Sequence, residues 1–231
     1  MIGIVIPAHN EAGYIGATLS AVRLAAAHAD LGGEPVRTVV VLDSCSDATA
    51  TVARQHDVCT LEVSARNVGR ARAAGAQWLL DEGARWLAFT DADTIVSPQW
   101  LVHQLALDAD AVCGSVGIDD WSPHAEHDVL IRTHFERTYT DADGHRHIHG
   151  ANLGVSAEAY RRVGGFAPLA CSEDVALVAA LEQAGARIAW SAAPRVATSA
   201  RRDARARGGF GDALLAAIAA GLAATEPPLA A

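Results

Sequence analysis

The stretch Trp86-Leu87-Ala88-Phe89-Thr90-Asp91-Ala92-Asp93 joins an apolar run to two carboxylates that are separated by one residue. The apolar run is predicted to form a buried strand, and the C-terminal ends of strands are where open α/β sheets bind ligands. In an extended chain, residues i and i+2 point to the same side, so Asp91 and Asp93 can converge on one hard cation. One or two carboxylates plus a substrate diphosphate commonly hold Mg2+ or Mn2+.

The stretch therefore predicts a metal and diphosphate site at the edge of a sheet. The alternative is an Asp-rich turn that caps a helix beginning at about Pro98. An isolated pair of this kind fits both settings, so the choice between them depends on the rest of the chain.

Upstream of this stretch, apolar β-type runs alternate with helix-like segments. The predicted strands cover 3–6, 38–42, 58–63 and 86–90, and the predicted helices cover 11–27, 47–55 and 68–80. This alternation predicts βαβ units and a mostly parallel central sheet. The strands are continuous apolar runs without polar alternation, as expected when helices cover both faces of a sheet. The predicted fold class is therefore α/β.

Downstream of Asp93 the pattern loosens. Segments 119–123 and 140–149 are rich in turn residues and precede a strand-like run at 151–155. Loops of this length in a compact domain are usually functional. Near the C-terminus, the basic run 201–207 precedes an apolar, helix-like segment at 213–224, which is either a core helix or an interfacial helix beside a basic patch.

Composition limits the classes of protein to which the chain can belong. Its 231 residues are enough for one domain with a substantial core, and 51% of them are hydrophobic. The formal net charge of −9 argues against a nucleic-acid partner, which would require clustered positive charge.

The cysteines and the N-terminus bear on the compartment. The four cysteines are widely spaced, which suggests buried thiols of a reducing cytoplasm and neither a zinc site nor a disulfide framework; they are Cys45, Cys59, Cys113 and Cys171. The apolar run at 1–7 is too short for a secretory signal or a membrane span. A cytoplasmic protein is therefore expected, and the basic and apolar C-terminal segment leaves open a peripheral contact with the inner face of the membrane.

Six motifs occur in an order and at a spacing that resemble family-two glycosyltransferases of the GT-A fold. They are Ile4-Val5-Ile6-Pro7-Ala8-His9-Asn10-Glu11, Asp43-Ser44-Cys45-Ser46-Asp47-Ala48-Thr49, Asn67-Val68-Gly69-Arg70, Asp91-Ala92-Asp93, Gly150-Ala151-Asn152 with Val163-Gly164-Gly165-Phe166, and Ser172-Glu173-Asp174. The resemblance covers residues 2 to about 212. It implies one Rossmann-like GT-A domain over 1–224, with a nucleotide-binding half at about 1–95, an acceptor and catalytic half at about 96–212, a C-terminal helix at about 209–224 and a disordered tail at 225–231.

The resemblance also implies an activity. Members of this family use a nucleotide-diphosphate sugar and a divalent cation, and they invert the anomeric carbon. The expected enzyme is thus a metal-dependent inverting glycosyltransferase of the hexosyltransferase type, with Mg2+ or Mn2+ as cofactor, a UDP- or GDP-sugar as donor and an unidentified hydroxyl acceptor. The Gln-x-x-Arg-Trp motif of processive synthases is absent, which favours transfer of a single sugar.

On this resemblance, each motif residue has an expected role. Asp93 binds chiefly the metal, Asp91 binds the ribose or a metal-bound water, and Asp174 is the base that deprotonates the acceptor. A carboxylate in the first turn of a helix is favoured in its ionised form by the helix dipole. The remaining positions expected to bind the nucleotide sugar are Pro7, Ala8, Glu11, Asp43, Asn67, Arg70, Ala92, Gly150, Asn152 and Glu173.

Several of these residues have a purely structural alternative. Asn10 and Asn67 are good helix N-caps, Asp43 is a turn former, and Glu173 and Asp174 are ordinary acids after a Ser172 cap. Asp43 also lacks the second, adjacent acid that the family usually shows. A further candidate for the diphosphate is Arg72, on the same predicted helix as Arg70.

Three other features have an undecided role. His145, His147 and His149 alternate, so an extended segment would place them on one face as a metal or acidic-substrate site, although a solvated histidine-rich loop is favoured. Trp121 can stack on a sugar or pack within its loop. Arg201, Arg202 and Arg205 lie where family members often carry a segment that closes over the diphosphate, and a solvated basic helix start is the alternative.

Two other functions compete with sugar transfer. One is a nucleotidyltransferase, which also builds a nucleotide site with acidic metal ligands on a parallel sheet. Its usual glycine-rich loop bearing Arg and Lys is missing after the first strand, where Ile6-Pro7-Ala8-His9-Asn10-Glu11 occurs instead. The other is a non-catalytic binder of nucleotide sugars, against which the presence of both Asp93 and Asp174 argues.

Overall fold

The N-terminal half alternates strands with helices, in agreement with the sequence prediction. The computed structural model describes residues 1–169, 171–202, 212, 215, 216 and 219. Its first elements are β1 (Ile2–Ala8), α1 (Ile15–Ala26), the 3-10 helix η1 (Ala29–Leu31), β2 (Val36–Asp43), α2 (Thr49–Ala53), β3 (Cys59–Val63), α3 (Val68–Asp81) and β4 (Trp86–Phe89).

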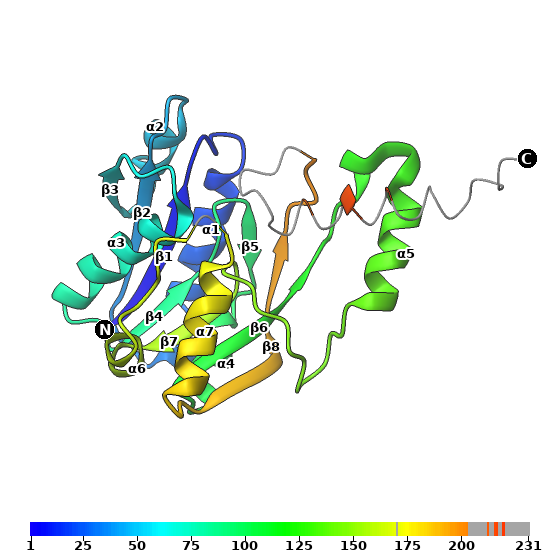
Figure 1. Ribbon diagram of the computed structural model, residues 1–231. Coiled ribbons are helices and arrows are strands. Elements are labelled where there is room, and N and C mark those ends of the chain that lie inside the picture. The colour runs from blue at the N-terminus through cyan, green and yellow to red at the C-terminus, as the bar shows by residue number, and fades with distance from the viewer. Residues whose placement is uncertain (170, 203–211, 213–214, 217–218, 220–231) are drawn as a thin grey trace, which may run out of the picture.

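The C-terminal half is less regular. It comprises β5 (Thr94–Val96), α4 (Trp100–Ala106), β6 (Ala111–Gly117), the 3-10 helix η2 (Ser122–His127), α5 (Asp128–Thr138), β7 (Leu153–Ser156), α6 (Ala157–Arg162), α7 (Glu173–Gln183) and β8 (Ile188–Thr198). The strand expected at 151–155 and the helix expected after Pro98 are both present. In Figure 1, α5 lies beyond β6 and β8, apart from the helices that cover the sheet.

The described strands form one eight-stranded sheet in the order β3-β2-β1-β4-β7-β6-β8-β5. The four strands from β3 to β4 are parallel to one another. Strand β7 is antiparallel to both of its neighbours, β6 and β8 are parallel, and β5 is antiparallel to β8. The predicted α/β fold is therefore confirmed. The parallel arrangement belongs to the N-terminal half, and the sheet as a whole is mixed.

The sequence patterns did not predict strands β6 and β8 or helix α5, and the structure gives a physical reason for each. Strand β6 contains Gly114 and Gly117, and β8 contains Pro194, which are residues that weaken a strand pattern. The pairing of these two strands shifts register between Gly114 and Val116. In α5, Ile131 is the one residue fully buried, so its apolar pattern is too weak to indicate a core-facing helix.

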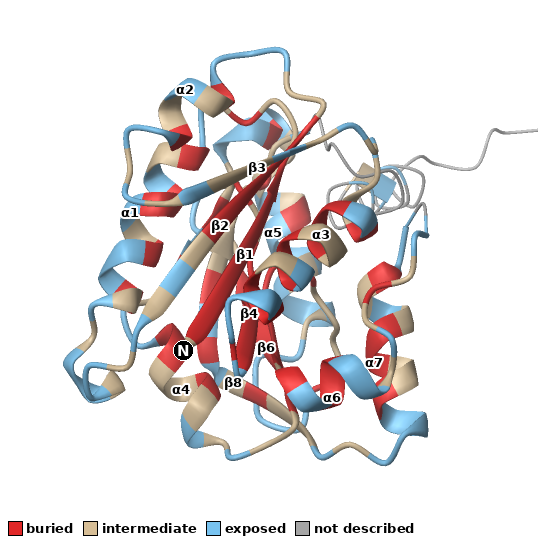
Figure 2. Cartoon of the chain, turned by 90° about the vertical axis from the view of Figure 1, so that its left-hand side faces the viewer, coloured by how far each residue is buried: buried red, intermediate tan, exposed pale blue. Residues whose placement is uncertain are grey.

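Two apolar layers enclose the sheet, because both faces of its central strands are buried (Figure 2). On β1, Ile2, Ile4 and Ile6 face α1 and α4, and Val5 faces α3. Helices α6 and α7 pack on the same face as α3. Burial on both faces explains why the strands have no polar alternation.

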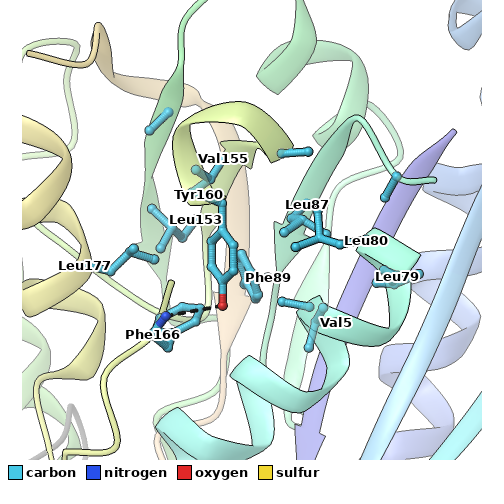
Figure 3. Close-up of a cluster of buried hydrophobic side chains, with 14 of the residues drawn as sticks. Val5, Leu79, Leu80, Leu87, Phe89, Leu153, Val155, Tyr160, Phe166 and Leu177 are labelled. Atoms are coloured by element: carbon cyan, nitrogen blue, oxygen red, sulfur yellow. Dashed lines mark hydrogen bonds between the residues drawn. The ribbon is translucent and has the colours of Figure 1, made fainter. Parts of the chain in front are cut away.

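An aromatic cluster lies at the centre of the face covered by α3, α6 and α7. The ring centroids of Phe89 and Phe166 are 4.9 Å apart in an edge-to-face arrangement, and Tyr160 lies 6.1 Å from Phe89. Figure 3 shows the Tyr160 hydroxyl accepting a hydrogen bond from the Phe166 backbone N–H, at 3.2 Å. This bond ties the chain at Phe166 to α6.

None of the described helices has the length and apolar character needed to cross a membrane. The expected C-terminal helix at 209–224 and the tail at 225–231 lie outside the described residues, apart from 212, 215, 216 and 219.

The expectation of four buried thiols was wrong: Cys113 is buried and Cys45 is partly buried, but Cys59 and Cys171 are exposed, since they lie on the edge strand β3 and in a surface loop.

The close approach of α3 to the sheet depends on Gly75. A Cβ atom added there would lie 2.7 Å from Val5 and 2.8 Å from Val41. We predict that Gly75→Ala destabilises the protein by about 1–2 kcal/mol, because overpacking outweighs the gain in helix propensity. The measurement is the urea midpoint at unchanged m-value.

Gly16→Ala in α1 is the matched control. Its added Cβ would meet Val52 at 3.5 Å, an ordinary contact. This variant should be neutral or more stable by up to about 1 kcal/mol. Equal midpoints for the two variants would contradict the packing explanation.

Candidate active site

The residues singled out in the sequence meet at the edge of the sheet where β1, β2 and β4 end. The parallel register places Ala8 of β1 beside Leu42 of β2, and Phe89 of β4 beside Val5 of β1. Glu11, Asp91 and Asp93 follow these strand ends directly. Arg72 and Gly150 connect this edge to the start of α7, and Arg201 joins Glu11 to Asp93.

Arg72 of α3 is the centre of one group of charges. Its side chain is 4% exposed, and it donates to Asp91 at 2.5 Å and to Glu173 in a very close contact. Burial alone would lower the pKa of Arg72, but Asp91 and Glu173 outweigh it and raise the pKa, so the guanidinium stays charged. It also lies 5.9 Å from the ring of Phe166, on top of the aromatic cluster. Arg72 is therefore a buried cation that is already paired with two carboxylates. It was a candidate to bind the diphosphate, and in this structure it is not accessible for that contact.

Glu173 is buried together with Arg72. Burial raises the pKa of Glu173, while the neighbouring guanidinium acts to lower it. The Ser172 cap that was considered for this helix is not formed, since Ser172 has a left-handed backbone and makes no capping bond. Glu173 thus faces inward and pairs with Arg72, and its expected contact with the nucleotide sugar stays a prediction.

Asp174 is held by the backbone. Gly150 N–H donates to Asp174 Oδ2 at 2.7 Å, and Val175 N–H donates to Oδ1 at 2.8 Å. Gly150 is needed here because an added Cβ would lie 2.4 Å from the guanidinium carbon of Arg72. The carboxylate of Asp174 is partly exposed, whereas that of Glu173 is buried. Of this acidic pair, Asp174 is therefore the one that can reach a ligand.

Arg201 organises a second group of charges. Its guanidinium binds both oxygens of Glu11, one of them at 2.6 Å, and lies 3.1 Å from Asp93 Oδ2. It also stands 5.0 Å from the ring of Tyr14. The side chains of Glu11 and Asp93 are 6% and 14% exposed, so Arg201 neutralises charges that water reaches poorly.

Asp91 and Asp93 do not lie on an extended strand, which corrects the expected geometry. The chain turns here between β4 and β5, and Thr94 N–H donates to the Asp91 carbonyl at 3.2 Å. Ala92 is buried in this turn, and its carbonyl accepts from the Thr18 hydroxyl at 2.9 Å. The two carboxylates still interact. Burial raises the pKa of Asp93 to about 6, with Asp91 and Glu11 adding to the rise and Arg201 opposing it.

The charges around Asp93 fit a divalent cation. Glu11, Asp91, Asp93 and Glu173 supply four carboxylates, and Arg72 and Arg201 balance two of them. Two negative charges remain when all four acids are ionised, and carboxylate oxygens suit Mg2+ and Mn2+. Among the described residues, no group of three or more His, Cys, Asp or Glu is arranged as a ready metal site. A cation at Asp93 would thus need ligands from water or from a bound anion.

The start of α3 matches the structural alternative for Asn67. Asn67 Oδ1 caps the helix by accepting from Arg70 N–H at 2.9 Å, and its amide donates to the Leu169 carbonyl at 2.9 Å. Arg70 is exposed in the first turn, and no carboxylate of the described residues pairs with it. This guanidinium remains available to an anion at the edge of the sheet.

Asp43 binds backbone groups in the structure, and its expected contact with a nucleotide base stays a prediction. Its carboxylate accepts from three successive backbone N–H groups, of residues 65, 66 and 67, at 2.8–2.9 Å, and from the Ser44 hydroxyl. Burial alone would raise the pKa of Asp43, but these donors lower it. Because Asp43 is 4% exposed and so fully engaged, it fixes the turn before α3.

Asn152 lies in the core, and its expected contact with a ligand stays a prediction. It is fully buried, accepts from Trp100 Nε1 at 2.9 Å and donates to the carbonyls of Ser115 and Pro194. An added Cβ at Gly114 would collide with its amide. Asn152 thus ties β6, β7 and β8 together where their register shifts. Pro7 and Ala8, at the end of β1, are buried as well.

The alternating histidines lie on one face, as expected, but they are not a solvated loop. Rings stack in the order Tyr139, His147 and His145, with centroids 4.1 and 5.6 Å apart, and His149 lies 5.8 Å from Tyr139. Tyr139 Oη accepts from Val116 N–H and lies 3.1 Å from His149 Nε2. Burial lowers the pKa of His149 to about 4, so it is neutral at pH 7.

Sequence reasoning missed Tyr14 and Tyr139. Tyr14 follows the first motif closely, and an aromatic side chain beside Glu11 was the available signal. Tyr139 directly precedes the histidine segment. Its stacking with His147 and His149 could not be predicted, because α5, which ends just before Tyr139, was not predicted. Trp121 was considered for stacking on a sugar. Its ring centroid lies 5.6 Å from that of Phe135 in α5, so it packs against this helix.

Solved structures with a similar fold are glycosyltransferases. TarS 1-349 from S. aureus, solved with UDP-GlcNAc, superposes with a TM-score of 0.65 at 13% identity over 96% of this chain and 66% of that chain. The mannosyltransferase PcManGT from Pyrobaculum calidifontis, solved with GDP-Man and Mn2+, gives 0.60 at 19% identity over 96% and 74%. Glucosyl-3-phosphoglycerate synthase from Mycobacterium tuberculosis, solved with Mn2+, UDP and phosphoglyceric acid, gives 0.61 at 17% identity over 96% and 78%.

These likenesses concern the fold. The chain spans 66% of TarS 1-349 and 37% of a longer TarS structure. No curated protein sequence matches this chain. The sequence profile described as glycosyl transferase family 2 matches residues 3–164, which include the first five motifs of the sequence except the C-terminal end of the fifth. Because this match covers more than half of the sequence, the chain belongs to glycosyl transferase family 2.

Proposed function

We propose that the protein transfers one sugar from a nucleotide-diphosphate sugar to an acceptor hydroxyl, with inversion at the anomeric carbon and with a divalent cation. The observation that carries this proposal is the presence, at one edge of the sheet, of an acidic cluster around Asp93 and a carboxylate held by the backbone at Asp174. Membership of the family sets the nucleotidyltransferase alternative aside. The similar structures solved with UDP-GlcNAc and with GDP-Man support a UDP- or GDP-sugar as donor.

The nucleotide is proposed to lie over the ends of β1 and β4. The backbone at Pro7 and Ala8 and the side chain of Glu11 line the nucleoside side, and Arg70 meets the diphosphate from the first turn of α3. A helix N-terminus with exposed N–H groups favours an anion at that position. The domain division into a nucleotide half at about 1–95 and an acceptor half at about 96–212 follows from this placement.

Asp93, with Asp91 beside it, is proposed to hold Mg2+ or Mn2+. When bound, such an ion supplies positive charge to the departing diphosphate. Asp91 is already oriented by Arg72, so its carboxylate cannot swing away from the turn. Two similar structures were solved with Mn2+, which supports metal use without choosing between the two ions.

Asp174 is proposed as the base. It accepts the proton of the acceptor hydroxyl while that oxygen forms a bond to the anomeric carbon. The bond from this carbon to the diphosphate oxygen breaks, and its electron pair leaves with the diphosphate. A single displacement of this kind inverts the anomeric configuration. The N–H groups of Gly150 and Val175 hold the Asp174 carboxylate in place.

The donor site is tested through Asp93. We predict that UDP or GDP binds to the wild-type protein only with Mn2+ or Mg2+, and that Asp93→Asn weakens this binding at least about tenfold, since it removes a charged ligand of the cation. The measurement is calorimetric titration of each nucleotide with and without metal. Asp81→Asn, at the far end of α3, is the control. Metal-independent binding by both proteins would contradict the site.

Arg201 gives a test in which the sign of the effect differs between two ligands. Arg201→Gln removes a cation 3.1 Å from Asp93 Oδ2, so Mn2+ alone should bind about fivefold or more tightly. The same variant should bind the Mn2+–nucleotide complex more weakly, because the diphosphate loses a positive partner. Both affinities are measured by calorimetry.

Arg70→Gln is the matched control for this test. It should weaken nucleotide binding but leave the affinity for Mn2+ alone unchanged, because Arg70 is exposed and has no carboxylate partner among the described residues. If Arg201→Gln lowers the affinity for Mn2+ alone as well as for the Mn2+–nucleotide complex, Arg201 does not compete with the cation.

The base is tested through Asp174. We predict that Asp174→Asn lowers turnover about 10²–10⁴-fold and leaves the dissociation constant of the donor nucleotide within about twofold. Turnover is followed as release of nucleoside diphosphate, with water or a screened hydroxyl compound as acceptor. Glu182→Gln, on the same helix, is the control. Full activity of Asp174→Asn would exclude this residue as the base, and absence of turnover in the wild type despite donor binding would favour the non-catalytic alternative.

A further inference from the structure

The turn at residues 149–152 carries the N–H group that holds the proposed base, and we call it the Gly150 turn. Its two ends are bonded to each other, since Asn152 N–H donates to the His149 carbonyl at 2.9 Å. This carbonyl and the Gly150 N–H belong to one planar trans peptide group, so they point in opposite directions. Fixing the carbonyl toward Asn152 therefore aims the Gly150 N–H at Asp174 Oδ2, which it meets at 2.7 Å.

The C-terminal end of the Gly150 turn is anchored in the core. The Asn152 side chain accepts from Trp100 Nε1 and donates to the carbonyls of Ser115 and Pro194. An anchor at one end leaves the peptide group before Gly150 able to tilt. The direction of its N–H therefore also depends on what holds the other end of the turn.

The N-terminal end is anchored by the hydroxyl of Tyr139. This oxygen accepts from the N–H of Val116 in β6 at 2.8 Å, and it lies 3.1 Å from His149 Nε2. A phenol has one proton to donate, and the bond from Val116 leaves that proton available to the imidazole. Strand β6 is thus connected through Tyr139 to the residue that precedes Gly150.

The protonation states of the two groups fit this arrangement. Burial raises the pKa of Tyr139 to about 12, with Asp141 adding to the rise. Burial lowers the pKa of His149 to about 4, with His147 adding to the fall and Asp174 opposing it. Both groups are therefore neutral at pH 7. The Tyr139 hydroxyl then donates to Nε2 of His149, and Nδ1 carries the proton of the imidazole.

The ring of Tyr139 is itself held in place. It stacks on Phe135 of α5 and on His147, with centroids 4.7 and 4.1 Å apart and ring planes inclined at 16° and 10°. The loop that carries His147 is bonded to β8, because Asp143 accepts from the Ser191 hydroxyl at 2.8 Å. These contacts fix the plane of the Tyr139 ring and thereby the place of its hydroxyl.

We propose that Tyr139 and His149 are positioning residues for the base: their hydrogen bond fixes the peptide group before Gly150 and so holds Asp174 where it meets the acceptor hydroxyl. This inference rests on the proposed function, in which Asp174 is the base. Both residues act through the Gly150 N–H. A base displaced by about 1 Å can lower a rate about 10²-fold, so the pair should affect turnover more than donor binding.

The experiment compares turnover with nucleotide affinity in four variants. They are Tyr139→Phe, which keeps the stacked ring, His149→Ala, His149→Gln and the double variant Tyr139→Phe/His149→Ala. Turnover is the hydrolysis of UDP-glucose, UDP-GlcNAc or GDP-mannose, whichever the wild type uses, in the presence of Mn2+. The affinity for UDP or GDP with Mn2+ is measured by calorimetry, and circular dichroism shows whether each variant is folded.

Tyr160→Phe is the matched control. Like Tyr139, Tyr160 accepts from a backbone N–H through its hydroxyl, and the donor is Phe166. Among the described residues, no hydrogen bond joins the Tyr160 hydroxyl to the Gly150 turn. This variant should lose a comparable bond and keep its turnover within about twofold of the wild type.

Tyr139→Phe and His149→Ala are each expected to lower kcat about tenfold or more and to leave the nucleotide affinity within about twofold. His149→Gln should recover most of the loss, because its side-chain oxygen can accept from the Tyr139 hydroxyl. The double variant should turn over within about twofold of His149→Ala, since both single changes break the same bond.

A second readout does not need turnover. The amide proton of Gly150 is followed by ¹H–¹⁵N NMR, and its hydrogen exchange reports the bond to Asp174. Exchange at Gly150 should be at least about tenfold faster in Tyr139→Phe than in the wild type, and unchanged in Tyr160→Phe.

The inference is overturned if Tyr139→Phe keeps the turnover of the wild type or leaves exchange at Gly150 unchanged. It is also overturned if the losses of the two single variants multiply in the double variant, or if Tyr160→Phe loses as much turnover as Tyr139→Phe. A wild type that binds nucleotide without turnover, with Gly150 exchange that responds to Tyr139→Phe alone, would overturn the proposed function and leave the anchoring of Asp174 by this pair standing.

Discussion

The buried guanidinium of Arg72 is the interaction on which the rest of the site depends. It joins the end of β4, through Asp91, to the start of α7, through Glu173, and it occupies the space that a side chain at residue 150 would need. Removing one partner from a buried pair of this kind costs about 3–5 kcal/mol, because the other charge is left uncompensated. The position of Asp174 follows from this network, since Gly150 N–H holds its carboxylate.

The charge groups centred on Arg72 and on Arg201 have different roles in the site. Arg72 is inaccessible and acts on ligands only through the acids that it orients. Arg201 is close to Asp93 and Glu11, at the place where the proposed cation and diphosphate would bind. The Arg201 guanidinium offsets the negative charge of these two poorly hydrated carboxylates, and it opposes the rise that burial causes in the pKa of Asp93.

The parallel half of the fold was predictable from the sequence, because β1, β2 and β4 are apolar on both faces and alternate with helices. The acidic motifs were found because strand ends carry their side chains to one edge. The sequence could not show which polar side chains already have partners within the protein. The Asp43 carboxylate accepts from three backbone N–H groups, the Asn152 amide has three partners in the core, and most of these partners are distant in the chain. Strands β6 and β8 were hidden by glycines, Pro194 and a shift in register.

The most direct test of the central claim, that the edge of the sheet at Asp93 is a cation and diphosphate site, is anomalous diffraction at the manganese edge from crystals grown with Mn2+ and UDP or GDP. The account predicts one manganese peak within about 2–2.5 Å of an Asp93 carboxylate oxygen, with the diphosphate on its open side and Arg201 no longer bound to Asp93. Nucleotide bound without manganese at Asp93, or manganese at the histidines 145, 147 and 149, would contradict it.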